Sequence, residues 1–276
     1  RTYMNTASSV QYRLLSGGTF MYLGIATALR KHLDKGNSFQ DNSVDLSFNI
    51  DGVPLFKSSN QGFWPILGKF EGYEPFTIAL WCGVGKPEPL DDYVSDFVQE
   101  ISVLQREGLQ HGDTHLNVNV KSFVCDAPAR AYLKCVNGHT AKIACERCQV
   151  KARWEGRAVY NNLPPGERRS DEEFANYRYR DYQKRPSPLL LSSILCVKQF
   201  SLDYMHLCCT GVCKRMLIFL KQGPKRCKLR RQERDSISER LEHLSGKMPK
   251  EFARQPRSMN ELDRWKSTEF RMFILY

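Results

Sequence analysis

The chain has 276 residues, 41% of them hydrophobic and 11% aromatic, so it can bury a sizeable core and is not a disordered tail. Its net charge of +11 favours a polyanionic partner, most often nucleic acid, although a basic face can also serve solubility alone. No apolar run approaches the roughly 20 residues that span a bilayer, so we expect no membrane segment.

The first residues carry no recognisable chemistry. The chain starts with Arg1, shows no signal-peptide pattern and ends at Tyr276 in mid-pattern, so we expect an internal fragment of a longer protein. Residues 1–36 are polar with scattered apolar anchors. We predict that they are helical, most clearly over Ile25–Leu33 with a stop at Gly36, and that they are the tail of an upstream region.

Two strand-like stretches each lead into an aspartate. In Val44–Ile50 apolar and polar residues alternate with period two, and Asp51-Gly52 follows. Asn117–Val124 has a similar pattern and leads into Cys125-Asp126. The matched endings predict two adjacent strands in one mixed sheet, with Asp51 and Asp126 close together.

The segments around these strands indicate an α/β fold of order β-β-β-α-β-α. Between them we predict a hairpin, a buried strand and a helix, at 54–67, Phe76–Val84 and Leu90–Leu109. After the second aspartate we predict a short helix at Pro128–Val136 and a fifth strand at Thr140–Ala144.

The second half of the chain is more polar. Residues 160–188 read as an exposed insertion outside the core, with a helix start at Ser170. Later helices are expected at 236–244 and 258–276. The predicted organisation is an upstream tail (1–40), the first part of an α/β core (41–144), an insertion with cysteines and basic residues (145–257) and a C-terminal helix (258–276).

The charge excess is concentrated in the insertion. Residues 198–257 hold 15 Lys and Arg and 6 Asp and Glu, a net charge of +9. Such a local basic surface predicts contacts with DNA phosphates, without base readout of its own. The alternative is a solvated face. The candidate phosphate contacts are Lys221, Lys225, Arg226, Lys228, Arg230 and Arg231.

Carboxylates at strand ends suit metal-dependent phosphodiester chemistry, in which two Mg²⁺ ions about 4 Å apart are held by acidic side chains. Asp51 and Asp126 are the first two candidates, although an aspartate after a strand is more often a turn former or a helix cap. Glu269 is a third candidate. Its alternative role is that of a surface glutamate paired with Arg271 or Lys266.

The pair Cys145-x-x-Cys148 has the spacing of a zinc knuckle, but one such pair is half a site. The alternatives are two unpaired buried cysteines or, less in keeping with the context, a redox pair. The lack of a secretory signal favours a reducing compartment. Candidate partners for a zinc ion are His206, Cys208, Cys209, Cys213, His139 and Cys135.

Several short motifs, in this order, resemble the transposase domain of CACTA (En/Spm-like) DNA transposons, especially copies scattered through animal genomes. They are NIDGVPLFKSS, WPI, VCDAPARA, CERC, SPLL, LDYMHLCCTGV and WKSTEFRMFILY, and the resemblance runs from Val44 to Tyr276. It implies an RNase H-like catalytic fold with a long zinc-bearing insertion and a DDE-type site. The expected substrates are transposon ends and target DNA in the nucleus.

The resemblance assigns roles to particular residues. Asp51, Asp126 and Glu269 would be the three catalytic carboxylates, working with Mg²⁺ or Mn²⁺. Cys145, Cys148 and His206 would bind a structural Zn²⁺, with Cys209 or His139 as the fourth ligand. The implied reaction is hydrolysis at the DNA ends, after which the freed 3′-hydroxyl attacks target DNA.

Other functions compete with this one. They are a domesticated or decayed transposase copy that binds nucleic acid or protein without cutting, a zinc-dependent interaction module, and an RNase H-like nuclease without strand transfer. An enzyme needs the three carboxylates in one pocket, whereas an interaction module needs only the zinc site and the core. A homo-oligomer is compatible with the sequence, which does not specify the oligomeric state.

Overall fold

Two adjacent parallel strands lead into the predicted aspartates. The computed structural model describes residues 12–56, 58–160, 164–252 and 254–276. In it, β3 (Ser43–Ile50) buries every second side chain from Val44 to Ile50, as its sequence alternation predicts. Beside β3 lies β8 (Thr114–Val124), with Val44 opposite Val118 and Phe48 opposite Phe123. The predicted adjacency of the two aspartate-bearing strands is therefore confirmed.

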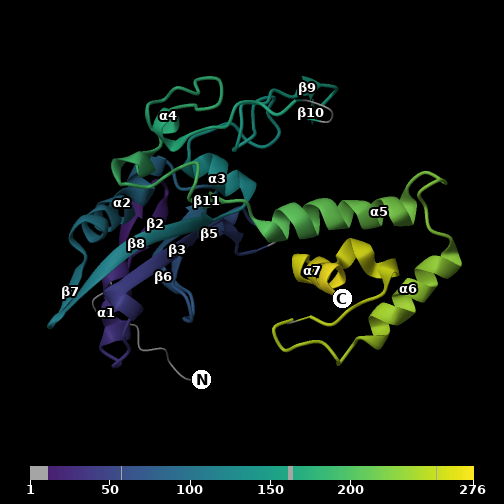
Figure 1. Ribbon diagram of the computed structural model, residues 1–276, viewed down its shortest axis with the longest axis horizontal. Coiled ribbons are helices and arrows are strands. Elements are labelled where there is room, and N and C mark those ends of the chain that lie inside the picture. Colours follow the sequence, from purple (N-terminus) through teal and green to yellow (C-terminus); the bar gives the residue numbers. More distant parts are fainter. Residues whose placement is uncertain (1–11, 57, 161–163, 253) are drawn as a thin grey trace. The chain divides into compact units, whose positions relative to one another are not determined.

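Nine strands of the described chain form one mixed sheet (Figure 1). Its order is β1 (Tyr12–Leu15), β2 (Gly18–Tyr22), β6 (Phe76–Val84), β5 (Gln61–Lys69), β3, β8 and β11 (Phe200–Ser201), with β4 (Val53–Pro54) beside β5 and β7 (Leu109–His111) beside β8. β3, β5 and β6 are antiparallel neighbours, whereas β8 runs parallel to β3 and β11 parallel to β8. The chain is a mixed α/β protein, as predicted.

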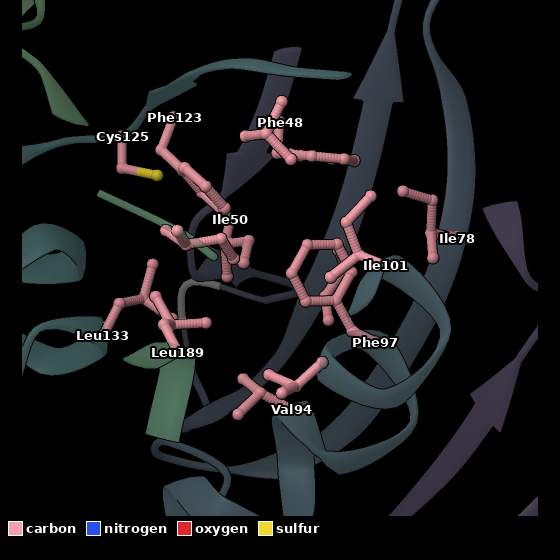
Figure 2. Close-up of a cluster of buried hydrophobic side chains, with 14 of the residues drawn as sticks. Phe48, Ile50, Ile78, Val94, Phe97, Ile101, Phe123, Cys125, Leu133 and Leu189 are labelled. Atoms are coloured by element: carbon pink, nitrogen blue, oxygen red, sulfur yellow. The ribbon is translucent and has the colours of Figure 1, made fainter. Parts of the chain in front are cut away.

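The longest helix, α2 (Leu90–Glu107), supplies much of the core. Its buried residues follow one another at spacings of one or three positions and define one apolar face: Leu90, Tyr93, Val94, Phe97, Val98, Ile101 and Leu104. Phe97 meets Phe48 edge-on, with ring centroids 5.0 Å apart, and packs near Phe123 (Figure 2). Burying each such side chain contributes about 1.5–3 kcal/mol to stability.

Other short elements complete this part of the chain. The helices are α1 (Ile25–Leu33), α3 (Ala127–Leu133) and α4 (Asp171–Ala175), and the 3₁₀ turns are η1 (Gln40–Asn42) and η2 (Pro188–Leu191). A two-stranded hairpin joins β9 (Arg153–Trp154) and β10 (Ala158–Val159).

The expectation of a helix over residues 1–36 is right for Ile25–Leu33 and wrong for residues 12–22, which form the β1–β2 hairpin. Ser16 and Gly17 have φ values of 49° and 72°. Two positive φ values in succession are what a tight hairpin turn needs. β2 pairs with β6 and buries Phe20, so this segment belongs to the sheet and its core. Residues 1–11 lie outside the described residues.

Two further expectations are corrected. Thr140–Ala144 is not a strand; the Asn137 amide holds it as a turn by donating to the carbonyl oxygens of Ile143 and Asp181. Residues 160–188 are not outside the core, because Phe174 and Tyr182 are buried in the same cluster as the sheet. The few apolar residues of this stretch are widely spaced among polar ones. They therefore form no periodic pattern from which burial could be predicted. The helix start at Ser170 is confirmed, since its Oγ accepts a hydrogen bond from the backbone N–H of Glu173.

The chain divides into two compact units, residues 1–201 and residues 202–276. The second unit contains the π-helix η3 (Met205–Cys213), α5 (Lys214–Gln222), α6 (Arg231–His243), the 3₁₀ helix η4 (Met259–Arg264) and α7 (Ser267–Leu275). It has its own core, built around Leu217, Leu262, Trp265 and Phe270. The helices expected at 236–244 and 258–276 are thus present, the second with a break before α7. Within the described residues, no helix is both long and apolar enough to cross a membrane.

Candidate active site at the ends of β3 and β8

Asp51 and Asp126 lie at the same edge of the sheet. Each follows the paired residues Phe48 and Phe123 by three positions, and parallel strands end at a common edge. The strands are held in this register by a contact of 3.1 Å between Ser47 Oγ and Ser122 Oγ. A hydrogen bond of 2.6 Å from Asn49 Nδ2 to the carbonyl oxygen of Val124 adds to it. The register therefore brings the two predicted aspartates to one place.

The charges of both aspartates act on the buried thiol of Cys125. The pKa of Cys125 is raised to about 12, chiefly by burial and in smaller part by the negative charges of Asp51 and Asp126. A hydrogen bond from the Ile50 backbone and the positive charge of Arg130 act in the opposite direction. The two carboxylates therefore both lie close enough to this buried group at the sheet edge to act on its pKa.

Local backbone hydrogen bonds orient the two carboxylates. Asp51 Oδ1 accepts from the backbone N–H of Gly52 at 2.7 Å. A side chain at Gly52 would collide with Trp64, because a Cβ there would lie 2.8 Å from the indole ring. Asp126 is the N-cap of α3, and its Oδ1 accepts from the backbone N–H of Ala129 at 2.7 Å. The helix-cap alternative is therefore correct for Asp126, and the cap also aims its carboxylate.

Two cations near this edge were not found by sequence reasoning. Lys86 places its ammonium 5.8 Å from the ring centroid of Trp64 and 5.3 Å from that of Tyr132. Arg130 is buried, and its Nη1 donates to the carbonyl oxygen of Cys125. A basic residue four positions after Asp126, at i+4 on the helix that it caps, was the available signal for Arg130.

Arg130 also connects the aspartates to the Cys-x-x-Cys segment. Its Nε lies 2.8 Å from Glu146 Oε1, and Lys134 Nζ lies 2.9 Å from Glu146 Oε2. All three side chains are largely buried. Burial alone would raise the pKa of Glu146, but the charges and hydrogen bonds of Lys134 and Arg130 hold it below its usual value. This ion-pair network fixes residues 145–148 to α3.

Cys145 and Cys148 face each other with their sulfur atoms 3.5 Å apart. Burial by itself would raise the pKa of Cys148. Hydrogen bonds from the backbone N–H groups of Val150 and Gly166 and from Cys145 outweigh this effect of burial, so the pKa of Cys148 is lowered overall. Two thiolates on one tetrahedral Zn²⁺, each about 2.3 Å from the metal, would lie about 3.8 Å apart. The pair therefore fits half of a zinc site.

The other two predicted zinc ligands belong to the second unit. His206 lies at the start of η3. Its Nδ1 is paired with the carboxylate of Asp203, three residues earlier in a D-x-x-H motif. The π-helix places the His206 carbonyl so close to Gly211 that a Cβ there would lie 2.8 Å from it. Cys209 is fully buried among apolar residues, and burial raises the pKa of its thiol. A zinc site completed by His206 and Cys209 stays a prediction.

The purified protein should contain one Zn²⁺ per chain at neutral pH, and Cys145→Ser or Cys148→Ser should release it, because each change removes one thiolate of the pair. Elemental analysis of the protein measures the metal. Cys227→Ser is the matched control, since Cys227 is an exposed cysteine in the second unit. Protein without zinc, or zinc content unchanged by the Cys145 and Cys148 variants, would contradict the prediction.

Glu269, the third predicted carboxylate, is 1% exposed and forms two contacts with Arg257, at 2.6 and 2.9 Å. Its Oε2 also accepts from the backbone N–H of Lys266 at 2.7 Å, which caps α7. The alternative of a surface glutamate paired with Arg271 or Lys266 is thus wrong, because Glu269 is buried and the side chain paired with it is that of Arg257. Glu269 belongs to the second unit, and its role as a metal ligand stays a prediction.

The predicted DNA-binding residues surround the connection between α5 and α6. Lys225, Arg226 and Lys228 lie in the turn, and all three are exposed. Arg230 and Arg231 begin α6, where they are exposed and pair with acidic residues one turn later. Lys221 differs, because its side chain is 13% exposed and its Nζ donates to the carbonyl oxygen of Asn260. Five of the six residues are therefore exposed, whereas Lys221 is held by contacts within the second unit.

Replacing Lys225, Arg226, Lys228 and Arg231 by Ala should weaken DNA binding to the same extent for unrelated duplexes. The slope of log affinity against log salt should fall by about 0.9 for each phosphate contact that is lost. Fluorescence anisotropy between low and physiological salt measures both quantities. Lys221→Ala is the control and should leave the slope unchanged. An unaltered slope in the fourfold variant would mean that this surface only solubilises the protein.

Comparison with known proteins adds no name to this site. No protein-family model matches the chain, and no curated protein matches it either. The function of the chain is therefore inferred from its residues and their geometry.

Proposed function

We propose that this chain is part of the catalytic domain of a DDE-type DNA transposase, which cuts transposon ends and joins them to target DNA with the help of Mg²⁺ or Mn²⁺. The observation that carries the proposal is the convergence of Asp51 and Asp126 at the ends of two adjacent parallel strands. Action on chromosomal DNA would take place in the nucleus.

The strand order supports an RNase H-like fold for the first unit. After the β1–β2 hairpin come three antiparallel strands, β3, β5 and β6, and α2 then leads through β7 to β8 on the other side of β3. Each aspartate therefore follows one of two adjacent parallel strands. This is the arrangement that the resemblance to CACTA transposases implies for the first two catalytic carboxylates.

The residues at the sheet edge fit a hard divalent cation. Asp51 and Asp126 are half-buried and supply carboxylate oxygens, which Mg²⁺ prefers. The backbone N–H groups of Gly52 and Ala129 orient them. Bound Mg²⁺ would supply an activated nucleophile and charge stabilisation at the phosphate. Lys86 can contact a DNA phosphate from the same edge, because its ammonium lies over Trp64, which packs on Gly52.

One observation favours a second candidate, a transposase-derived domain that binds DNA without cutting it. Both oxygens of Glu269 are held within the second unit by Arg257 and by the α7 cap. These contacts would stabilise the second unit whether or not the protein cleaves DNA. The basic α5–α6 connection would then carry the function.

A cleavage assay separates these functions. The full-length protein is incubated with labelled DNA that carries the terminal repeats of its own genomic element, in Mg²⁺, Mn²⁺ or EDTA. A transposase should give metal-dependent cuts with 3′-hydroxyl ends and then strand-transfer products. Cleavage without transfer would instead indicate a nuclease, and salt-sensitive binding without cleavage would indicate the second candidate.

A further inference from the structure

The guanidinium of Arg169 is clamped between two aromatic rings in the first unit. Its Cζ lies 4.6 Å from the ring centroid of Tyr179 and 4.0 Å from that of Tyr182. The Nε donates to the carbonyl oxygen of Cys145 at 3.1 Å, and the backbone N–H donates to the carbonyl oxygen of Arg147 at 3.0 Å. This side chain is thus fixed in place, with little rotamer freedom left to lose when it binds a ligand.

Two polar atoms of this cluster lack hydrogen-bond partners. Arg169 is 7% exposed and Tyr182 is 1% exposed, yet Arg169 Nη2 and Tyr182 Oη make no hydrogen bond within the part of the chain that the structure describes. Buried polar groups in proteins almost always have a partner, so two orphans in contacting side chains call for an explanation. A ligand with several acceptor oxygens would supply one.

Both side chains line the same cavity, which has a volume of about 350 Å³. Its rim carries three exposed cations, Lys151, Arg178 and Arg180, and none of them forms an ion pair with any described residue. Among the described lining residues the one acid is Asp181. The cavity is therefore strongly positive, with a rigid arginine and a tyrosine hydroxyl as unpaired donors.

We propose that this cavity binds a phosphate group, with Arg169 and Tyr182 as the inner donors and Lys151, Arg178 and Arg180 at the rim. A phosphate fits better than a carboxylate, because its oxygens point in several directions and can accept from a guanidinium, a hydroxyl and rim cations together. The volume exceeds that of one phosphate, so the ligand is a phosphate ester, either a small metabolite or a nucleotide of a DNA strand. The site does not depend on the proposed transposase function.

Inorganic phosphate is the first probe, and calorimetric titration into the full chain measures its affinity. Tyr182→Phe removes one unpaired hydroxyl and should leave the fold intact while weakening phosphate binding about tenfold, the usual value of a hydrogen bond to a charged group. Arg178→Gln with Arg180→Gln should weaken it further. The matched control is Arg153→Gln with Arg157→Gln, which removes the same charge from exposed residues of the β9–β10 segment outside the cavity and should change nothing.

Competition identifies the source of the phosphate. A 5′-phosphorylated single-stranded oligonucleotide that displaces inorganic phosphate from the wild type, but not from the Arg178–Arg180 variant, would assign the site to DNA. Displacement by ribose 5-phosphate alone would assign it to a small phosphate ester. The proposal is overturned if phosphate does not bind, or if it binds the Tyr182→Phe and Arg178–Arg180 variants as tightly as the control. Because no cleavage is measured, this result is separate from the test of the transposase mechanism.

Discussion

Asp51→Asn and Asp126→Asn should each abolish DNA end cleavage while DNA binding persists. Either change removes one of the two negative charges that the sheet edge offers to divalent metal ions, and asparagine keeps the size of the side chain. Metal-ion catalysis is worth several kcal/mol, so we expect cleavage to fall by at least about 10³-fold. The measurement is the rate of strand cleavage in Mg²⁺ by the full-length protein at saturating DNA.

The structure allows loss of activity to be separated from loss of folding. Asn caps a helix about as well as Asp, so Asp126→Asn should preserve the cap on Ala129 and the stability of α3. Asp45→Asn is the matched control, since Asp45 is an exposed aspartate on β3, six residues before Asp51, and pairs with Asn119. Cleavage that survives both Asp51→Asn and Asp126→Asn would refute the proposed mechanism.

Glu269→Gln should lower both stability and cleavage. The glutamate is buried, it accepts two contacts from Arg257, and it caps α7 through Lys266. Removing one partner of such a pair leaves a charge without its counterpart. Because Arg257 remains 31% exposed, we expect a loss of about 2–3 kcal/mol rather than the full cost of a buried pair. Urea unfolding measures this loss.

Arg257→Gln is the control that distinguishes the two roles of Glu269. It breaks the same ion pair but leaves the carboxylate, so a purely structural role predicts the same loss of stability and of cleavage in both variants. If Glu269 is the third metal ligand, then at a temperature where both variants are folded only Glu269→Gln should be inactive. If Glu269→Gln remains active while the aspartate variants do not, the third ligand must be sought at Glu261 or Asp263.

The local patterns of the sequence determined most of the first unit. Period-two alternation identified β3, a strongly apolar run identified β6, the spacing of apolar residues identified α2, and Ser170 correctly marked a helix start. The matched strand endings also predicted that β3 and β8 are neighbours. These features succeed because burial of one face imposes a fixed period on the sequence.

Other features were decided only by tertiary structure. The β1–β2 hairpin depends on two positive φ values at Ser16 and Gly17 and on pairing with β6. The sequence of this segment is polar with few apolar residues, so its pattern predicts neither feature. The contribution of Phe174 and Tyr182 to the core comes from residues that are isolated in the sequence. Within the described residues, the lack of hydrogen-bond partners at Arg169 Nη2 and Tyr182 Oη is likewise visible only in the folded structure.

For the candidate site, the sequence named the chemical groups and the fold determined their surroundings. Residue type and position gave Asp51, Asp126 and the Cys145–Cys148 pair, because carboxylates and thiolates are the ligands that metals use. The sequence did not reveal that Glu146 lies between Arg130 and Lys134, or that Arg257 binds Glu269. The free energy of burying a charge depends on its paired partner, and that partner is chosen by packing between elements that lie apart along the chain.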